Sequence, residues 1–424
     1  MDIKKVLASE RIKNAKIMME IATNNYTENR NKVLEEVNKE ELKERVKKIK
    51  EYSIDNLNSL KTKAIKNLER QKIKVFEAKN AKEAREIVLK LIPKKQLIVK
   101  SKSNTIKEIG LLDHLKKRNE VVETDTGDFI VQITEDKASH TLSPALHIPL
   151  KKITQTISKK FHVKVKEDPE EIVAWVRDYL RKKIIKAKMG LTGANAISAD
   201  GAIFIVENEG NISLVSRLPE KHIIITGIEK IVPTIQDAIT ICYASGIWGS
   251  GVFMPTYINV IGSPSKTADI RKELTYGLQG AKEVYLILVD NGRTQMIKED
   301  FKELLYCVNC GGCLYFCPVY RQIFDNYGFH YIGGKGVAMA TLQDGIEKGF
   351  DSGLYFCTTC QLCKENCPFE IDIPKLIKKL RKKTVEKGLE TRINEKMMGN
   401  IRTMGNPFGE EVKEGKIPKE LYCC

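Results

Sequence analysis

Two short cysteine-rich stretches constrain the fold of this chain more than any other feature of its sequence. They span residues 307–318 and 357–368, and each reads C-x2-C-x2-C-x3-C-P. Together they contain eight of the 11 cysteines in the chain. Thiolates at this spacing can converge on one face of a compact inorganic core, as in loops that hold a [4Fe-4S] cluster. The sequence therefore predicts two such clusters.

The fourth cysteine of each stretch is expected to bind the cluster of the other stretch, as in two-cluster proteins with this spacing. One predicted set of ligands is Cys307, Cys310, Cys313 and Cys367, and the other is Cys357, Cys360, Cys363 and Cys317. Because each stretch supplies a ligand to the other, we expect the two to fold as one unit.

Zinc and disulfide bonds are the alternatives for these cysteines. Structural zinc sites usually combine two separated C-x2-C or Cys/His pairs, which the crowding of four cysteines in each stretch fits poorly. Disulfides are typical of secreted chains, whereas residues 1–5 lack the apolar core of a secretory signal. Both alternatives explain the spacing less well than iron–sulfur clusters do.

Length and charge favour a water-soluble protein of about two to three domains, because 424 residues exceed one ordinary core. No apolar run approaches the roughly 18 residues of a membrane helix, so we expect no membrane span and a cytoplasmic location. The formal charge of +16 falls to about +12 if each cluster with its thiolates carries roughly −2. The lysines alternate with glutamates along helices, which favours an acidic redox partner over nucleic acid.

The hydrophobic pattern divides the chain into four parts. Residues 1–71 are expected to form long charged helices, and residues 72–296 an α/β domain with a largely buried sheet. Residues 297–385 should form a helical two-cluster domain, and residues 386–424 a C-terminal tail. Short apolar or β-branched runs predict strands at 72–78, 96–101, 120–124, 202–206, 223–225, 257–261 and 284–289. Helical periodicity predicts helices at 81–91, 105–118, 168–186 and 337–348.

Polar turns follow several predicted strands of the α/β domain, where open sheets of this class bind their ligands. They lie at residues 192–195, 207–211, 227–230 and 262–269. None of them is a dinucleotide or triphosphate fingerprint. Each also has a simpler explanation as an ordinary loop, because Gly and Asn tolerate positive φ.

A small hydroxy- or oxo-carboxylate bound at these turns needs cations around its carboxylate and a base near its carbinol proton. The candidate cations are Lys100, Lys102, Lys230, Lys266 and Arg293. The candidate bases are His140, His147, Glu207 and Glu229, and Lys230 is also a candidate catalytic group. A single histidine is more often a structural hydrogen-bonding group than a catalytic one, and this alternative stays open for every residue named here.

Several stretches resemble the iron–sulfur member of the lactate-utilisation (LUD-domain) family. They are residues 99–103, 122–127, 139–140, 144–147, 190–195, 208–211, 227–234 and 290–293, together with both cysteine stretches and residues 371–374. The resemblance is collinear over about residues 10–385. It implies a domain similar to the NagB/RpiA/CoA-transferase-like α/β fold, preceded by long helices and followed by an α-helical two-cluster ferredoxin domain. The glycine-rich segment at 331–336 departs from the pattern of that family.

The same resemblance implies an electron-transfer subunit of a system that oxidises L-lactate to pyruvate. Clusters carry single electrons whereas lactate oxidation releases two, so a flavin or similar cofactor is expected in a partner protein. Two other functions remain open. One is the iron–sulfur module of a heterodisulfide-reductase-like complex, and the other is a catalytic α/β enzyme acting on a CoA ester or sugar phosphate.

Three cysteines lie outside the two stretches. Cys242 sits in an apolar helical run at 235–242 and is expected to be a small buried hydrophobe. Cys423 and Cys424 end the chain as a neighbouring pair. A tail without a cluster role is the simpler expectation for them, with metal binding or contact with a partner as the alternative.

Overall fold

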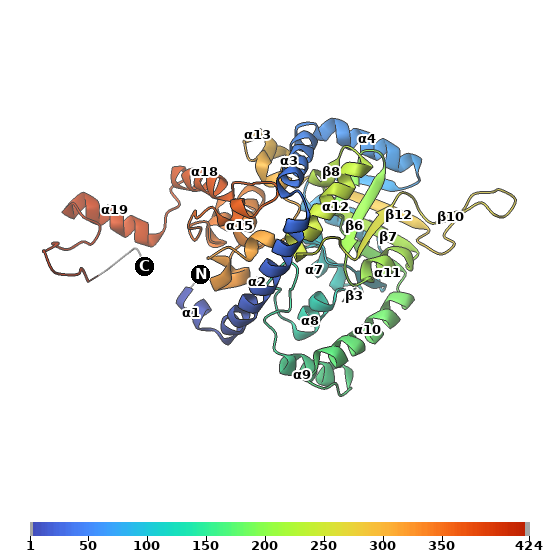
Figure 1. The fold of residues 1–424 in the computed structure, drawn as a ribbon, viewed down its shortest axis with the longest axis horizontal. Helices are drawn as coiled ribbons and strands as arrows, with labels where there is room; N and C mark the ends of the chain where they lie inside the picture. The colour runs from blue at the N-terminus through green and yellow to red at the C-terminus, as the bar shows by residue number, and fades with distance from the viewer. Residues whose placement is uncertain (1–2, 420–424) are drawn as a thin grey trace.

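A six-stranded parallel sheet forms the centre of the α/β domain in the computed structural model, which describes residues 3–419 (Figure 1). Its order is β1 (Lys74–Ala78), β12 (Glu283–Val289), β7 (Lys221–Gly227), β4 (Met189–Thr192), β2 (Leu97–Lys100) and β3 (Glu120–Glu123). Every neighbouring pair of these strands is parallel. The central strands β12 and β7 are buried along almost their whole length, because helices cover both faces of a parallel sheet. The predicted α/β fold class is confirmed.

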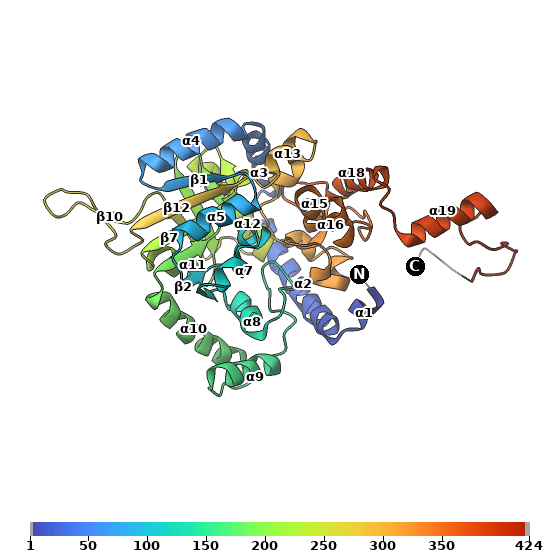
Figure 2. The same ribbon diagram turned by 180° about the vertical axis from the view of Figure 1, so that it is seen from behind.

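A second, four-stranded sheet was not anticipated by the sequence pattern. Its order is β8 (Ile231–Val232), β5 (Ala196–Ser198), β6 (Ala202–Glu207) and β9 (Tyr257–Ile261). A separate hairpin of β10 (Lys266–Thr267) and β11 (Thr275–Tyr276) projects from the body of the protein (Figures 1 and 2). Lys266, a predicted carboxylate-binding cation, lies in this exposed hairpin and lines none of the cavities described below.

Helices on both sides of the main sheet begin where the sequence supplies a side-chain cap. Asn80, Asp125, Asp168 and Thr234 each accept a backbone N–H three residues on. The predicted helix at 105–118 is two helices instead, because Gly110 between them adopts a left-handed φ of 61°. These helices are α5 (Ala81–Leu91), α6 (Asn104–Glu108), α7 (Leu111–Lys116), α8 (Thr126–Thr134), α9 (Leu150–Phe161), α10 (Pro169–Lys186), α11 (Asn211–Arg217), the 3-10 turn η1 (Ile228–Lys230) and α12 (Ile235–Ser250).

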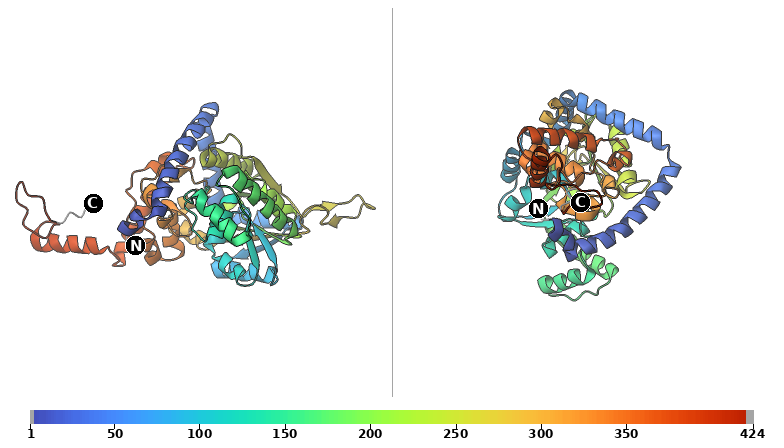
Figure 3. Two further views of the ribbon diagram at one scale, coloured as in Figure 1. Left: turned by 90° about the horizontal axis from the view of Figure 1, so that it is seen from below. Right: turned by 90° about the vertical axis from the view of Figure 1, so that its left-hand side faces the viewer.

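The N-terminal helices connect the two halves of the molecule (Figure 3). They are α1 (Ile3–Ala8), α2 (Glu10–Glu36), α3 (Lys39–Asp55) and α4 (Leu57–Arg70). The chain turns at Asn56, which separates α3 from α4. Helix α4 packs on the α/β domain, whereas α2 shares one hydrophobic core with α12 and the cysteine-rich region. The N-terminal region therefore covers both domains and not the α/β domain alone.

Short helices surround the cysteines in the C-terminal part. They are α13 (Arg293–Lys298), η2 (Lys302–Tyr306), η3 (Gly312–Leu314), α14 (Tyr320–Ile323), η4 (Phe324–Asn326), α15 (Gly333–Gln343), α16 (Ile346–Asp351), α17 (Leu362–Glu365) and α18 (Ile373–Glu386). Helix α19 (Arg392–Met404) extends away from the body and buries none of its residues (Figures 1 and 3). Within residues 3–419, no helix combines the length and apolar character needed to cross a membrane.

Candidate iron–sulfur centre and adjoining cavity

The two cysteine stretches, named window one (307–318) and window two (357–368), share an unusual backbone conformation. In window one, Asn309 and Gly311 flank the second cysteine with φ of 63° and 79°. In window two, Thr359 and Gln361 occupy the equivalent positions with φ of 57° and 69°. Left-handed residues on either side of a cysteine reverse the chain direction twice within five residues. The two windows therefore have the same backbone turn at their second cysteine. Such a turn suits a loop that wraps a cluster.

The two windows lie close together in the tertiary structure, and the crossed assignment of their ligands stays a prediction. Burial, together with the negative charge of Cys310 and Cys307, raises the pKa of the Cys367 thiol. Burial, together with Cys357 and Cys360, likewise raises the pKa of Cys317. The fourth cysteine of each window thus lies beside the first cysteines of the other window, which is the arrangement that two shared clusters require.

A small cavity at window two contains all four thiols of one predicted ligand set. It has a volume of about 50 Å³, and Cys317, Cys357, Cys360 and Cys363 line it together with Cys313 of the other set, two polar residues (Lys335 and Thr358) and apolar side chains. No three His, Cys, Asp or Glu side chains within residues 3–419 are close enough to hold a single metal ion. Four thiols are the donor set that a [4Fe-4S] cluster takes, so the residues that line this cavity fit such a cluster.

Burial disfavours the thiolate form of these cysteines when no cation lies beside them. Burial, and then the neighbouring Cys307, raises the pKa of Cys310 to about 11. Burial and Cys317 raise the pKa of Cys363 to about 12. A buried thiolate therefore requires strong positive charge beside it, which iron supplies.

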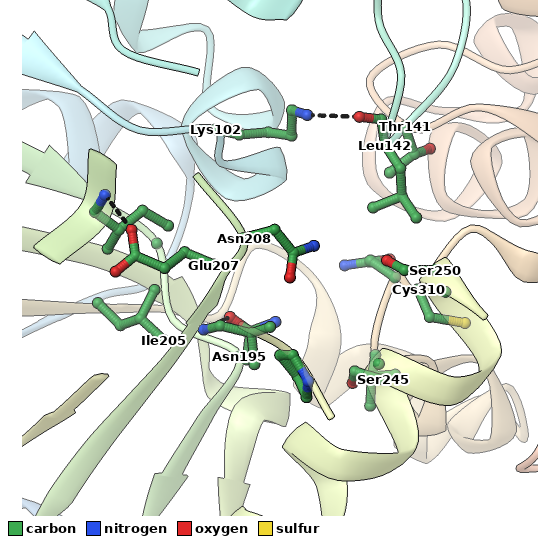
Figure 4. A pocket seen from close by; sticks show the side chains of 18 of the residues that line it. Lys102, Thr141, Leu142, Asn195, Ile205, Glu207, Asn208, Ser245, Ser250 and Cys310 are labelled. Atoms are coloured by element: carbon green, nitrogen blue, oxygen red, sulfur yellow. Dashed lines mark hydrogen bonds between the residues drawn. The ribbon is translucent and has the colours of Figure 1, made fainter. Parts of the chain in front are cut away.

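A second structural feature, the strand-end cavity, lies between the α/β domain and window one (Figure 4). It has a volume of about 450 Å³ and is lined by the turns that follow β2, β4 and β6, by the end of α12, and by residues 308–310. In Figure 4, Ile205 and Glu207 lie on one side and Cys310 on the other. The ligand-binding edge of the sheet therefore opens directly onto a predicted cluster ligand.

Helix α12 holds window one against the α/β domain. A Cβ atom built on Gly312 would lie 2.1 Å from the carbonyl oxygen of Trp248, and one built on Gly249 would lie 3.0 Å from that of Cys310. The hydroxyl of Tyr26 donates a 2.7 Å hydrogen bond to the same Trp248 oxygen. Glycine is needed at these contacts because the two backbones touch, which fixes the distance between the sheet and window one.

Comparison with known proteins assigns both parts of the chain. The LUD domain family matches residues 61–289, and the 4Fe-4S dicluster domain family matches residues 303–371. The chain belongs to the LUD-domain family. A protein named Lactate utilization protein B from Bacillus subtilis is 34% identical over 366 residues, covering 85% of this chain and 74% of that protein. The protein of the same name from Oceanobacillus iheyensis is 33% identical, covering 85% and 75%.

One solved structure is also similar, although too distantly to support an argument. It is the crystal structure of a DUF162 family protein from Deinococcus radiodurans, with a TM-score of 0.32 and 11% identity, covering 55% of this chain and 98% of that one. The recognised family and the dicluster match together support iron–sulfur chemistry and a place in lactate utilisation.

A buried ion network joins the LUD domain to the dicluster domain. The guanidinium of Arg293 donates to both carboxylate oxygens of Glu108, at 2.8 and 2.7 Å, and also to Glu229. Tyr331 and Gln343, from the dicluster domain, donate to the same Glu108 carboxylate. Arg293 therefore neutralises two buried carboxylates and is not available to bind a substrate, contrary to its prediction as a carboxylate-binding cation.

Two of the predicted bases are held in structural contacts. Although burial opposes the charge of Glu229, Arg293 and Lys230 outweigh it and lower the pKa of this carboxyl to about 2. Glu207 accepts from the backbone N–H groups of Ile212 and Ser213 at the start of α11. These contacts favour structural roles, and a catalytic role for either residue stays an untested prediction.

The predicted histidines lie in the loop between α8 and α9. His147 contacts the hydroxyl of Ser139 at 2.9 Å and the carboxylate of Asp136 at 3.2 Å. His140 is almost fully buried, and its Nδ1 accepts the backbone N–H groups of Leu142 and Ser143 at 3.2 Å each. A catalytic role for either histidine also stays a prediction.

The predicted lysines differ in how completely they are paired. Lys100 is fully buried in an ion pair with Glu123 at 2.7 Å. Lys102 pairs with Asp125 at 3.1 Å and donates to the carbonyl oxygen of Leu142. Lys230 contacts only the carbonyl oxygen of Cys307, at 3.4 Å, and forms no salt bridge with any residue in the described part of the chain. Lys230 lines the strand-end cavity, as Lys102 does, and burial lowers the pKa of Lys230.

Sequence reasoning missed two further lysines near window one. The Nζ of Lys50, from helix α3, donates to the carbonyl oxygen of Glu229, and burial lowers the pKa of Lys50 to about 7. The Nζ of Lys335 donates to the side-chain oxygen of Asn309. Lys50 lies far from residues 307–318 in sequence, where nothing distinguishes it from the many surface lysines. Lys335 lies in the glycine-rich segment at 331–336, which was the available signal.

Proposed function

We propose that this chain is an iron–sulfur electron-transfer component of a multi-protein system that oxidises L-lactate or a related 2-hydroxy acid. The supporting observation is that the strand-end cavity of the LUD domain and window one share a wall at Cys310. A ligand at the edge of the sheet thus lies next to a redox centre. The names of the relatives point to lactate as the substrate of the whole system.

The proposed cofactors are two [4Fe-4S] clusters. One is bound by Cys307, Cys310, Cys313 and Cys367, and the other by Cys357, Cys360, Cys363 and Cys317. A bound cluster of this type accepts and passes single electrons. The conversion of lactate to pyruvate releases two electrons, so the two-electron cofactor, a flavin, is proposed to reside in a partner subunit.

The strand-end cavity is proposed to hold a small carboxylate through Lys230. The side chain of Lys230 is buried and makes one long hydrogen bond, so a bound carboxylate would give its ammonium group a direct ion-pair partner. The cavity of about 450 Å³ is ample for a molecule of the size of lactate. Asn195 and Asn208 line the same space and offer amide groups to a hydroxyl (Figure 4).

The proposed partners are other subunits of the oxidising system and a redox carrier in the cytoplasm. A formal charge of +16 gives the chain a basic surface, which favours an acidic docking partner. We propose no contact with nucleic acid.

The test is anaerobic purification with native partners, followed by iron analysis and electron paramagnetic resonance (EPR). We expect about eight iron atoms per chain, cluster signals after reduction by dithionite, and no reduction by L-lactate alone. Adding back a co-purifying flavoprotein should make the clusters reducible by L-lactate. In a Lys230→Met variant this reduction should need a higher lactate concentration, whereas Lys266→Met in the distant hairpin should behave as wild type.

Three outcomes would contradict the proposal. Rapid lactate oxidation by the isolated chain would place the catalytic centre within it. A disulfide-reducing partner that delivers electrons in place of a flavoprotein would favour the heterodisulfide-reductase-like alternative. Tight binding of a CoA ester or sugar phosphate by iron-free protein would favour a separate α/β enzyme.

A further inference from the structure

The buried ring of His140 has a defined tautomer and one unused hydrogen-bond donor. Its Nδ1 accepts two backbone N–H groups, from Leu142 and Ser143. A nitrogen that accepts carries no proton, so the proton of the neutral ring is on Nε2. Burial, and then the charge of Lys102, lower the pKa of His140 to about 3, which keeps the ring neutral.

The Nε2–H group has no hydrogen-bond partner among residues 3–419. His140 lines a cavity of about 770 Å³ together with Cys307, Gly311 and Cys313 of window one. A Cβ built on Gly311 would lie 4.0 Å from Cε1 of His140, the ring atom between Nδ1 and Nε2. The ring therefore lies against window one, at the cavity that two predicted cluster ligands line.

The ring is also held in place from its sides. Its centroid lies 4.9 Å from that of Tyr315 and 6.0 Å from that of Tyr320, two aromatic residues that belong to window one or follow it directly. The hydroxyl of Tyr320 in turn donates 2.7 Å to the carbonyl oxygen of Ser139, the residue before His140. These contacts fix the loop that carries the histidine to the segment that carries the cysteines.

We propose that the Nε2–H of His140 donates a hydrogen bond to a sulfur of the cluster bound by Cys307, Cys310, Cys313 and Cys367. Sulfur is the only acceptor type that the predicted cofactor adds at this wall of the cavity, and a buried donor without a partner is costly. This inference rests on the proposed cluster and extends it to a residue outside both cysteine windows.

This hydrogen bond should give the two clusters different reduction potentials. A hydrogen bond to cluster sulfur stabilises the reduced, more negative state more than the oxidised state, and so raises the reduction potential. The donor would act on the cluster beside the strand-end cavity and not on the cluster of window two. Electrons entering the chain should therefore collect on the cluster nearest the LUD domain.

The first test uses the wild-type chain, labelled with nitrogen-15 histidine and reduced with dithionite. Pulsed EPR should detect coupling of one cluster to a single histidine nitrogen, and His140→Asn should remove that nitrogen coupling. Coupling to exchangeable protons without any histidine nitrogen would mean that water fills the gap, and would overturn the inference.

The second test is a redox titration of matched variants. His140→Phe should lower the reduction potential of one cluster by about 59 mV, which is a tenfold change in its one-electron equilibrium. His140→Asn keeps an N–H donor and should therefore show a smaller decrease. His222→Phe is the control, because His222 is also fully buried but bonds Thr192 within the sheet. Equal potentials in all four proteins would overturn the inference.

Iron content distinguishes an error in the role of His140 from an error in the cluster assignment. About eight iron atoms per chain with no histidine coupling would refute the role of His140 alone. A wild-type chain that binds no iron would refute both the cluster assignment and the hydrogen bond.

Discussion

Replacing Arg293 with leucine should destabilise the protein strongly and in a pH-dependent manner. The guanidinium is 1% exposed and contacts the carboxylates of Glu108 and Glu229, which are 0% and 5% exposed. Removing one partner from a buried ion pair typically costs about 3–5 kcal/mol, because the remaining charge is left uncompensated. Here two carboxylates lose the same cation, although Asn291 and Gln343 still donate to Glu108 at 2.7 and 2.9 Å. We therefore expect a loss of about 4 kcal/mol at pH 8.

The pH dependence follows from the two carboxyl groups. In the wild type, burial opposes their charge but Arg293 outweighs it, so the pKa of Glu108 is lowered and that of Glu229 falls to about 2. Their contribution is complete above the unfolded pKa of about 4.3 and is lost only as pH falls through the folded values. In Arg293→Leu, burial dominates at Glu108 and raises its pKa above 4.3, whereas Lys230 still lowers the pKa of Glu229. The variant should then lose stability as pH rises through the raised pKa of Glu108, and the deficit should shrink from pH 8 to pH 6.

The assay is unfolding by urea at pH 8 and pH 6, followed by far-ultraviolet circular dichroism, with cluster absorbance recorded in parallel. Arg177→Leu is the matched control, since Arg177 pairs with Asp178 on the surface with both side chains about 60% exposed, and its loss should be below about 0.5 kcal/mol. A deficit for Arg293→Leu below about 1 kcal/mol at pH 8, or one of equal size at both pH values, would refute this reasoning.

Three further predictions concern the clusters and the tail. If the ligands are crossed, Cys310 and Cys367 bind the same cluster, so replacing both with alanine should leave about four iron atoms per chain. Replacing Cys310 and Cys317 with alanine should remove a ligand from each cluster and leave almost no iron. The reverse result in iron analysis would show that each window binds its own cluster. Lys335 lines the cavities at both windows, so Lys335→Met should lower the reduction potential of both clusters by on the order of 50 mV each. An EPR-monitored redox titration measures these potentials, and unchanged values would exclude this electrostatic role. Deleting residues 387–424 should change neither iron content nor the melting temperature, because α19 buries no residue; a loss of iron would instead assign a ligand role to Cys423 or Cys424, which lie outside the described residues.

Local sequence patterns were sufficient for the main elements of the fold. Short apolar or β-branched runs predicted strands such as β7 and β12, and helical periodicity predicted helices such as α5 and α10. Cys242 is fully buried in helix α12, as predicted. These features succeed because they depend on neighbours within a few residues along the chain, which the sequence shows directly.

Patterns failed where the outcome depended on contacts between distant segments. The break at Asn56, the second sheet and the packing of α2 on both domains follow from which surfaces meet in the folded chain. The same holds for Arg293, whose charge suggested a substrate contact. Its partners Glu108 and Tyr331 are 185 and 38 residues away, so only the folded structure shows that its charge is already neutralised.

The sequence by itself determined the chemistry of this protein, and the tertiary structure decided where that chemistry takes place. The spacing of eight cysteines is enough to predict two iron–sulfur clusters, because successive ligands of the motif are only three residues apart in the sequence. The strand-end cavity at Cys310, the charge of Lys230 and the unused donor of His140 are not encoded by spacing. They arise because helix α12 and the loop after α8 press window one against the open edge of the parallel sheet, and such contacts exist only after the chain has folded.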